Sequence, residues 1–372
     1  MLDGGERAQA SMLVLARESR GWTQSELASQ MTQVAGDGGT VVSQGYVSKV
    51  EAGKVAVSPE RLSLFASALG YPEHLFYVDP QVHGVGVGLI HHRKRASLPA
   101  SALRVIHATL ALVRIQINGL ISALGGPERP VNFSHKPIAP LRDAKRIARE
   151  VRQEWGLPPG PVDNVIKAAE DAGAVVVMRD LNSDLLDAVS QKPETGPPLL
   201  LVNERAPGAR CRFSVAHEIG HLIMHIEPGK GTEQEQQADA FASEFLMPAK
   251  DISEQIPSRL GIAELASLKQ KWGVSMAALL RRGRDVGVIT DWQYRNLAVE
   301  MSTLGYRTAE PMEIPLERPS YMEGLLEQLL KEEGMASEQV AYESYLKPSE
   351  FTVLYVNDSC SVSQQEATEV RL

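Results

Sequence analysis

Residues 210–248 constrain this chain more than any other stretch, because they contain two histidines four residues apart, in His217-Glu218-Ile219-Gly220-His221. Residues at this spacing lie on one face of a helix, so both imidazoles can reach one metal ion. Glu218 directly follows the first histidine, where it can take a proton from a water that the metal activates. The spacing favours a metal-dependent hydrolase, although an ordinary amphipathic helix also carries such a pattern.

The residues around this motif predict where its helix begins and ends. Ser214 is a residue type that caps helix N-termini, and Pro228 with Gly229 would end the helix. His225 continues the histidine face, but a site that already has three ligands does not need it.

A second helix from Thr232 supplies carboxylates for the same site. Glu235 and Asp239 lie four residues apart on one face, which suits Glu235 as third ligand and Asp239 as a hydrogen-bond partner of a ligating histidine. Three alternatives remain for these residues. Thr232 and Glu235 also fit a capping box, and Glu233 or Glu244 can serve as the ligand instead.

The two helices together resemble the ImmA/IrrE family of metallopeptidases, in which HELGH is followed by ExxA[ND]xFAxxLLMP; here HEIGHLIMH is followed by EQQADAFASEFLMP. The resemblance implies a zinc-dependent endopeptidase that cleaves a protein, usually a DNA-binding repressor. It implies that His217, His221 and Glu235 are gluzincin-like zinc ligands. It also implies Glu218 as catalytic base, and Asp239 stands where many relatives have Asn. Similar ligand sets accept other divalent metals.

Residues 7–76 carry the pattern of a compact domain of five short helices. A first helix ends near Gly21, and Thr23 with Glu26 forms a capping box that opens a second helix through Met31. Further helices are expected at residues 43–51, from Pro59 onward and at residues 72–76.

This series of helices resembles the XRE-type helix-turn-helix of phage-like repressors, whose third helix enters the major groove of DNA. The resemblance implies that Gln44 and Tyr46 face bases, with Ser48 and Lys49 near the bases or the backbone. It also implies that Gln24, at the start of the second helix, holds a phosphate.

Two features of this domain depart from the pattern. Residues 32–42 replace the tight turn between the second and third helices, and residues 1–80 carry six Lys/Arg against nine Asp/Glu, a net charge of −3. Because phosphate neutralisation supplies much of DNA affinity, we expect weak DNA binding by this module alone. A five-helix protein-docking or dimerisation module is the alternative.

The middle of the chain predicts a linker, a long helix and a small sheet. Residues 77–100 have linker composition, with a basic cluster at 91–95 that either touches DNA backbone or is solvated. Residues 99–124 form a helix with one buried face, suited to an interdomain strut or a dimer seam. Strands are expected at residues 174–178, 186–190 and 199–203, packed on the two metal-site helices.

The fold expected from these patterns is mostly α with a small β-sheet (α+β). An N-terminal five-helix helix-turn-helix domain is followed by a zincin-like peptidase domain and a helical C-terminal region. The expected boundaries are 1–80 for the helix-turn-helix, 81–139 for linker and long helix, 140–285 for the ImmA/IrrE-like core and 286–372 for the C-terminal region.

Composition bounds the remaining possibilities. Of 372 residues, 43% are hydrophobic and 23% charged, as in ordinary globular proteins. The net charge of −8 does not suggest a protein whose surface as a whole is adapted to bind nucleic acid. The two cysteines, Cys211 and Cys360, exclude a disulfide scaffold and fit a reducing cytoplasm. No apolar run approaches the roughly 20 residues of a membrane helix, so we expect no membrane partner.

Two functions fit the sequence. The first is a zinc endopeptidase fused to a DNA-binding domain, which cleaves a repressor or antitoxin-like regulator. The second is a DNA-binding transcriptional regulator whose peptidase fold acts as a sensor or dimerisation body with little turnover; the intact motif argues against it.

Overall fold

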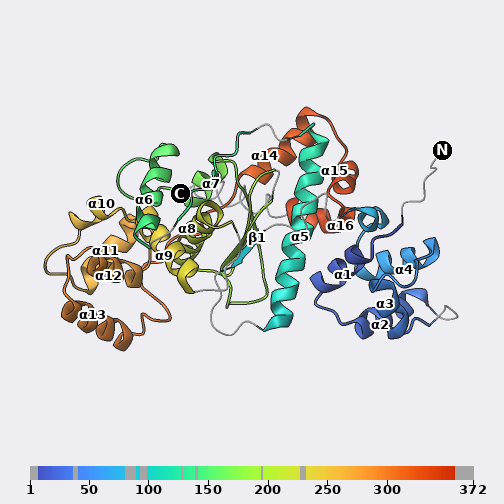
Figure 1. The fold of residues 1–372 in the computed structure, drawn as a ribbon, viewed down its shortest axis with the longest axis horizontal. Coiled ribbons are helices and arrows are strands. Elements are labelled where there is room, and N and C mark those ends of the chain that lie inside the picture. Colours follow the sequence, from blue (N-terminus) through green and yellow to red (C-terminus); the bar gives the residue numbers. More distant parts are fainter. Residues whose placement is uncertain are drawn as a thin grey trace, which may run out of the picture. The chain divides into compact units, whose positions relative to one another are not determined.

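The computed structural model describes residues 7–36, 41–79, 89–92, 99–126, 129–138, 141–193, 196–226 and 232–356. The chain forms two compact units (Figure 1). One contains residues 1–88, 98–128 and 321–372, and the other contains residues 89–97 and 129–320. The stretches expected as linker with long helix and as C-terminal region therefore each divide between the two units.

The first unit begins with the expected helical domain, drawn in blue in Figure 1. Its helices are α1 (Ala10–Ser19), α2 (Gln24–Ala35), α3 (Gln44–Glu51), α4 (Pro59–Leu69) and the short η1 (Glu73–Tyr77). The capping box of Thr23 and Glu26 opens α2, and Pro59 is the first residue of α4, both as predicted. Helix α2 runs beyond the expected end at Met31 to Ala35, and the Thr32 hydroxyl in its last turn accepts a hydrogen bond of 2.9 Å from the Val42 amide.

Helix α5 (Ala100–Ala123) is the interior helix of this unit. We expected one buried face, but residues 110–117 are buried on every side. Helices α1 and α15 (Ser337–Glu343) pack against α5, and a Cβ at Gly119 would lie 2.0 Å from the Glu343 carbonyl oxygen. This burial favours an interior helix over the dimer seam.

The same helix, α5, corrects the prediction about membrane-spanning segments. By length and composition α5 could cross a membrane, with a mean hydropathy of 1.4 in its most apolar window, contrary to the expectation that no apolar run is long enough. Of that window, 72% is buried inside the protein, as in the core helix of a globular unit.

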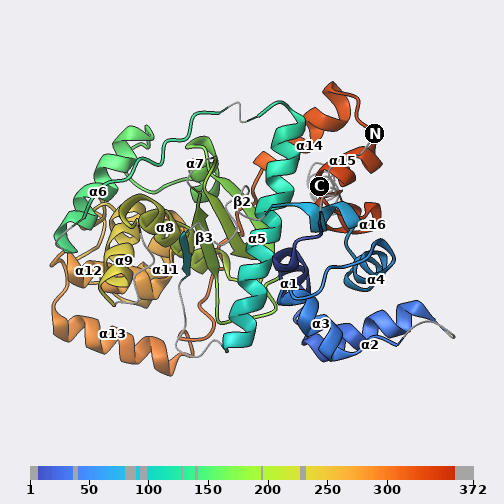
Figure 2. The same ribbon diagram turned by 45° about the vertical axis from the view of Figure 1, so that its right-hand side comes forward.

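The remaining helices of the first unit follow the expected C-terminal patterns and lie together at the red end of the colour scale (Figure 2). They are α14 (Tyr321–Glu327), η2 (Gln328–Glu332), α15, α16 (Pro348–Phe351) and η3 (Thr352–Val356). Among their contacts with the helical domain, Arg20 pairs with Glu350 at 2.8 Å, and His74 stacks on Tyr342 at 3.9 Å between ring centroids.

The second unit is built on a four-stranded sheet in the order β1-β3-β4-β2. The strands are β1 (Leu89–His92), β2 (Val175–Arg179), β3 (Ala188–Lys192) and β4 (Leu199–Asn203). β2 is parallel to β4, whereas β4 and β3, and β3 and β1, are antiparallel. The three strands predicted from sequence are present, each within two residues of its expected start.

Strand β1 was not predicted, because residues 77–100 were expected to form a linker. Its backbone pairs with β3 along Leu89–His92, so part of that stretch belongs to the sheet. A strand of four residues followed by a basic cluster has too little alternation of apolar and polar residues to be recognised from sequence. In addition, its partner strand lies about 100 residues away in sequence. Residues 93–95 of the basic cluster lie outside the described residues.

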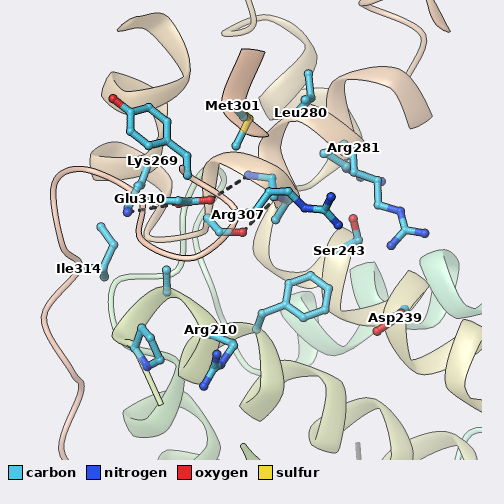
Figure 3. Close-up of a pocket in the computed structure, with 18 of the residues that line it drawn as sticks. Arg210, Asp239, Ser243, Lys269, Leu280, Arg281, Met301, Arg307, Glu310 and Ile314 are labelled. Carbon is cyan, nitrogen blue, oxygen red and sulfur yellow. Dashed lines mark hydrogen bonds and ion pairs between the residues drawn. The ribbon is translucent and has the colours of Figure 1, made fainter. Parts of the chain in front are cut away.

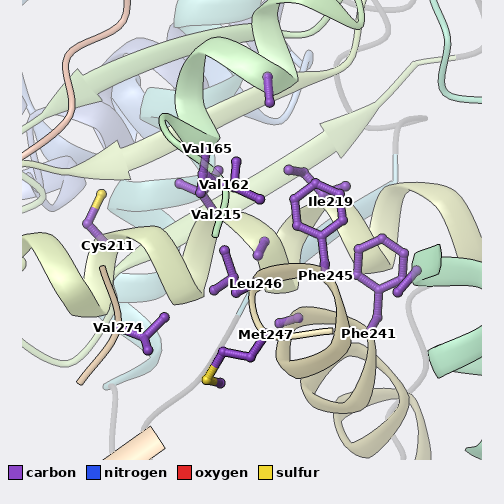
Figure 4. Packing of buried hydrophobic residues seen from close by; sticks show 14 of the residues in the cluster. Val162, Val165, Cys211, Val215, Ile219, Phe241, Phe245, Leu246, Met247 and Val274 are labelled. Carbon is purple, nitrogen blue, oxygen red and sulfur yellow. The ribbon is translucent and has the colours of Figure 1, made fainter. Parts of the chain in front are cut away.

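Helices α8 (Gly208–Met224) and α9 (Thr232–Leu246) carry the sequence motif and pack on each other. α8 lies against β3 and β4, whereas the main contacts of α9 are with α8 and α6 (Leu141–Glu154), so α8 supplies most of this pair's contact with the sheet. Phe241 fixes their close approach, because a Cβ at Gly220 would lie 3.0 Å from its ring. Figure 4 shows Phe241 and Phe245 of α9 beside Ile219 of α8 in the buried core.

The start of α8 differs from the prediction. The helix begins at Gly208, six residues before Ser214, and Ser214 lies inside it with its hydroxyl 3.3 Å from Asp187. A buried carboxylate partner lets a cap-type residue sit in the helix interior. The helix ends at Met224, and the expected stop at Pro228 and Gly229 lies outside the described residues.

The second unit has further helices beside the motif helices. They are α7 (Val165–Asp171), which packs on α8 and β2, and the group that follows α9, namely α10 (Ala249–Ser253), α11 (Ile262–Trp272), α12 (Met276–Asp285) and α13 (Asp291–Thr303).

Candidate metal centre

Three predicted residues converge at the junction of α8 and α9. The Nε2 atoms of His217 and His221 lie 3.0 Å apart, and the Glu235 carboxylate lies 3.4 Å from the first and 3.3 Å from the second. Within the described part of the chain these residues form a group that could hold a metal ion, with ligand atoms within 4.8 Å of one another. Both histidines are buried, whereas Glu235 is partly exposed.

The position of Glu235 separates its two predicted roles. Helix α9 begins at Thr232 itself, so Thr232 occupies the first helical position and not the cap. The Glu235 carboxylate faces the imidazoles. The geometry supports a ligand over a capping-box residue.

The alternative carboxylates are engaged elsewhere. Glu244 is buried in an ion pair with Arg282 and accepts a bond from Arg149 at 2.9 Å. Glu233 accepts from Gln237 at 3.3 Å. Neither belongs to the group of ligand atoms.

Each histidine of the pair has a polar partner on its other ring nitrogen. Asp239 lies 2.9 Å from His217 Nδ1, where the sequence placed it. His225 Nδ1 lies 2.9 Å from His221 Nδ1, and His225 Nε2 lies 2.9 Å from Gln237 Oε1. His225 was not predicted to belong to the site, although its spacing of four residues from His221 was the signal that could have identified this contact.

Glu218 is fully buried next to this cluster, at 0% exposure. Its Oε2 accepts a hydrogen bond of 2.5 Å from the hydroxyl of Ser190 on β3. Sequence reasoning missed Ser190, since no local pattern marks a serine that meets the motif from another element.

The protonation states suit ligands. Burial is the main cause that lowers the pKa of His221 to about 4, so its imidazole is neutral at pH 7 and keeps a lone pair. Burial tends to raise the pKa of Glu235, but hydrogen bonds to His217 and His221 outweigh it and hold that pKa far below its usual range. The cluster thus offers the neutral imidazole of His221 and the carboxylate of Glu235 as ligands.

A cavity of about 1140 Å³ lies on the Asp239 side of the cluster (Figure 3). Arg281 of α12 and Arg307 line it and form no ion pair with a described residue, whereas Lys269 is paired with Glu310 at 3.2 Å. Positive charge therefore faces a space that Asp239, the partner of His217, also lines.

The predicted DNA-contacting residues lie in α2 and α3 of the other unit. Gln44 is exposed and donates to Gln24 at 2.8 Å, which joins the N-termini of the two helices. Lys49 is exposed and Ser48 half-buried. Tyr46 is also half-buried, with its ring 6.4 Å from that of Phe65.

Comparison with protein families matches two stretches of the chain. Residues 169–283 match the peptidase family M78, described as the IrrE N-terminal-like domain, and residues 13–76 match the helix-turn-helix family. The chain therefore contains an IrrE N-terminal-like peptidase domain and a helix-turn-helix domain. The peptidase match includes α8 and α9 whole, and the helix-turn-helix match includes α2 to α4. No curated protein matches the chain as a whole or in part.

Proposed function

We propose that the chain is a zinc-dependent endopeptidase that cleaves a DNA-binding regulator of the repressor or antitoxin type. The observation that carries the proposal is the convergence of His217, His221 and Glu235 next to Glu218. The fused helix-turn-helix domain supports a substrate that is itself found on DNA, and with it the expected cytoplasmic location.

The residues present fit zinc. Four ligands at about 2.0–2.2 Å in a tetrahedron lie about 3.3–3.6 Å apart. The three donor atoms here are separated by 3.0, 3.3 and 3.4 Å. Two histidines and one glutamate leave a fourth position for water or substrate, as catalytic zinc sites do. When bound, zinc would polarise the scissile carbonyl and make the attacking water more acidic.

Glu218 would act as the base. It takes a proton from the attacking water as the water oxygen bonds to the carbonyl carbon, and it then gives that proton to the amide nitrogen as the C–N bond breaks. The bond from Ser190 occupies Oε2 and orients the carboxylate.

The partners of the histidines would fix their tautomers. Asp239 accepts a hydrogen bond from His217 Nδ1, which leaves the lone pair on Nε2. His225 does the same for His221 if its own proton lies on Nε2 and is donated to Gln237 Oε1. This arrangement keeps both Nε2 atoms available to the metal.

For the helix-turn-helix, we propose DNA contact through Gln44, Tyr46, Ser48 and Lys49, with Gln24 on a phosphate. The bond between Gln24 and Gln44 supports a shared role, because it holds both amides at the N-termini of α2 and α3. The half-buried ring of Tyr46 limits its reach toward a base.

Metal analysis combined with a cleavage assay tests the peptidase proposal. Glu218→Gln should retain about one zinc per chain and lose cleavage of repressors encoded beside its gene, because Glu218 is a base and not a ligand. His217→Ala and His221→Ala should lose both zinc and cleavage. Loss of zinc in a folded Glu218→Gln protein would contradict the assignment, and cleavage at the wild-type rate would refute the mechanism.

A further inference from the structure

Strand β1 occupies the outer edge of the sheet, on the side of the metal centre. Its backbone runs antiparallel to β3, and His91 stands opposite Ser190 in the register. β1 also lies against α8, the helix that carries the histidines. Figure 1 labels β1 at the sheet beside the green strands of the peptidase unit.

This register brings a peptide backbone next to Glu218. Ser190 on β3 donates to the Glu218 carboxylate at 2.5 Å, and neighbouring strands lie about 4.7–4.9 Å apart. The backbone of β1 near residue 91 therefore runs one strand spacing from the residue that holds the base. Glu218 is 0% exposed in this arrangement, so the base is closed to solvent.

A protein substrate would need the same place. An extended peptide binds by adding a strand to a free sheet edge, where backbone hydrogen bonds provide affinity. Without β1, β3 would be the edge strand on this side, and a peptide paired with it would pass beside Glu218.

We propose that residues 89–92 are an internal competitor that holds the substrate-binding edge of β3, and that an extended segment of the substrate displaces β1 and pairs antiparallel in its place. The proposal rests on the proposed function, because Glu218 must be the base for this edge to be the substrate edge. A tethered segment competes at an effective concentration on the order of 1 mM. A four-residue strand pair is weak enough to open, since an isolated two-stranded pair is only marginally stable.

The test measures binding, in a Glu218→Gln background that prevents hydrolysis. In one variant Gly-Ser-Gly-Ser replaces residues 89–92, which keeps the chain length and removes strand propensity. In a control variant, Gly-Ser-Gly-Ser replaces the exposed residues 53–56 of the helix-turn-helix domain. The probe is a fluorescein-labelled synthetic peptide of residues 86–95, with a scrambled peptide beside it, followed by anisotropy.

In the 89–92 variant, where no internal strand competes, we expect the probe to bind with a Kd of about 10 µM. In the unreplaced chain, β1 competes for the same edge at an effective concentration of about 1 mM, so the probe should bind about 100-fold more weakly. The control variant should bind like the unreplaced chain. In hydrogen exchange, the amides of β3 should lose protection in the 89–92 variant until the probe is added, while β4 stays protected, which shows that the unit remains folded.

Equal probe affinity with and without residues 89–92, or unchanged β3 protection, would overturn the proposal. Self-cleavage within residues 89–92 of the Glu218-containing chain, seen by mass spectrometry, would also overturn it, because the segment would then be a substrate. If the enzyme assignment were wrong, the binding and exchange differences would persist without any cleavage activity, so the two failures are distinguishable.

Discussion

Substitution of Glu235 by Gln separates a metal ligand from a helix-end residue. The carboxylate lies 3.4 and 3.3 Å from the two Nε2 atoms, and its side chain is 46% exposed. Glutamine keeps the size and helix propensity of the residue but removes the anionic ligand. We therefore expect the metal-free variant to keep its helical content and nearly its melting temperature.

Zinc binding should change much more. Substitution of a residue that hydrogen-bonds to a metal ligand typically lowers metal affinity about 10–100-fold. Loss of a ligand itself should therefore lower zinc affinity at least about 100-fold. At the same saturating free zinc, the increase in unfolding free energy caused by zinc should then fall by at least about 2.7 kcal/mol, since each tenfold in affinity is about 1.4 kcal/mol.

The assay is denaturant unfolding in zinc buffers and in chelator. Glu233→Gln is the matched control, because Glu233 lies on the same helix and loses the same charge, but its carboxylate contacts Gln237. It should bind zinc like the wild type. Wild-type zinc affinity in Glu235→Gln, or a loss confined to Glu233→Gln, would refute our choice of third ligand while leaving the two histidines in place.

Two further predictions concern DNA and the buried thiol. DNA binding should require residues 7–76, and DNA affinity should fall steeply as the salt concentration rises. Gln44→Ala should reduce the free-energy difference between the preferred and other DNA sequences by about 1–3 kcal/mol. Loss of the positive charges at residues 93–95 should instead weaken binding to all sequences alike. Anisotropy titrations check this, and equal promoter affinity of a chain without residues 1–80 would refute it. Burial raises the pKa of Cys211 to about 12, from 9.0 ordinarily, so the folded thiol stays protonated while the unfolded thiol ionises. In a Cys360→Ser background, the stability contribution of Cys211 should be complete below pH 9 and decline as pH rises toward 12, relative to a Cys211→Ala control. A pH profile that matches the control would contradict this burial.

The sequence predicted best what depends on neighbouring residues. The spacing of His217 and His221 needs only helical geometry, and the helix itself is confirmed. The capping box at Thr23 and Glu26 and the β4 strand also appear at their predicted positions, because side-chain chemistry within a few residues determines both. The ligand role of Glu235 stays a prediction, now supported by its position beside the imidazoles.

Elements that depend on distant partners were wrong or missed. Ser214 was expected to start a helix that in fact begins at Gly208, because Asp187 accepts the serine hydroxyl inside the helix. Helix α5 was expected to bury a single face, yet α1 and α15 pack on it and its residues 110–117 are all buried. The spacing of apolar residues within one segment does not show how many other helices will pack on it.

The sequence by itself thus determined that two histidines share one helix face with Glu218 directly after the first, and that a second helix carries further carboxylates. Only the tertiary structure decided which carboxylate meets the histidines, since Glu244 is drawn away by Arg282 and Glu235 is not. It alone placed Ser190 on the base and β1 along the edge of β3. The physical reason is that helical spacing is fixed by the backbone within one turn, whereas contacts between elements far apart in sequence are selected by the packing of the whole unit.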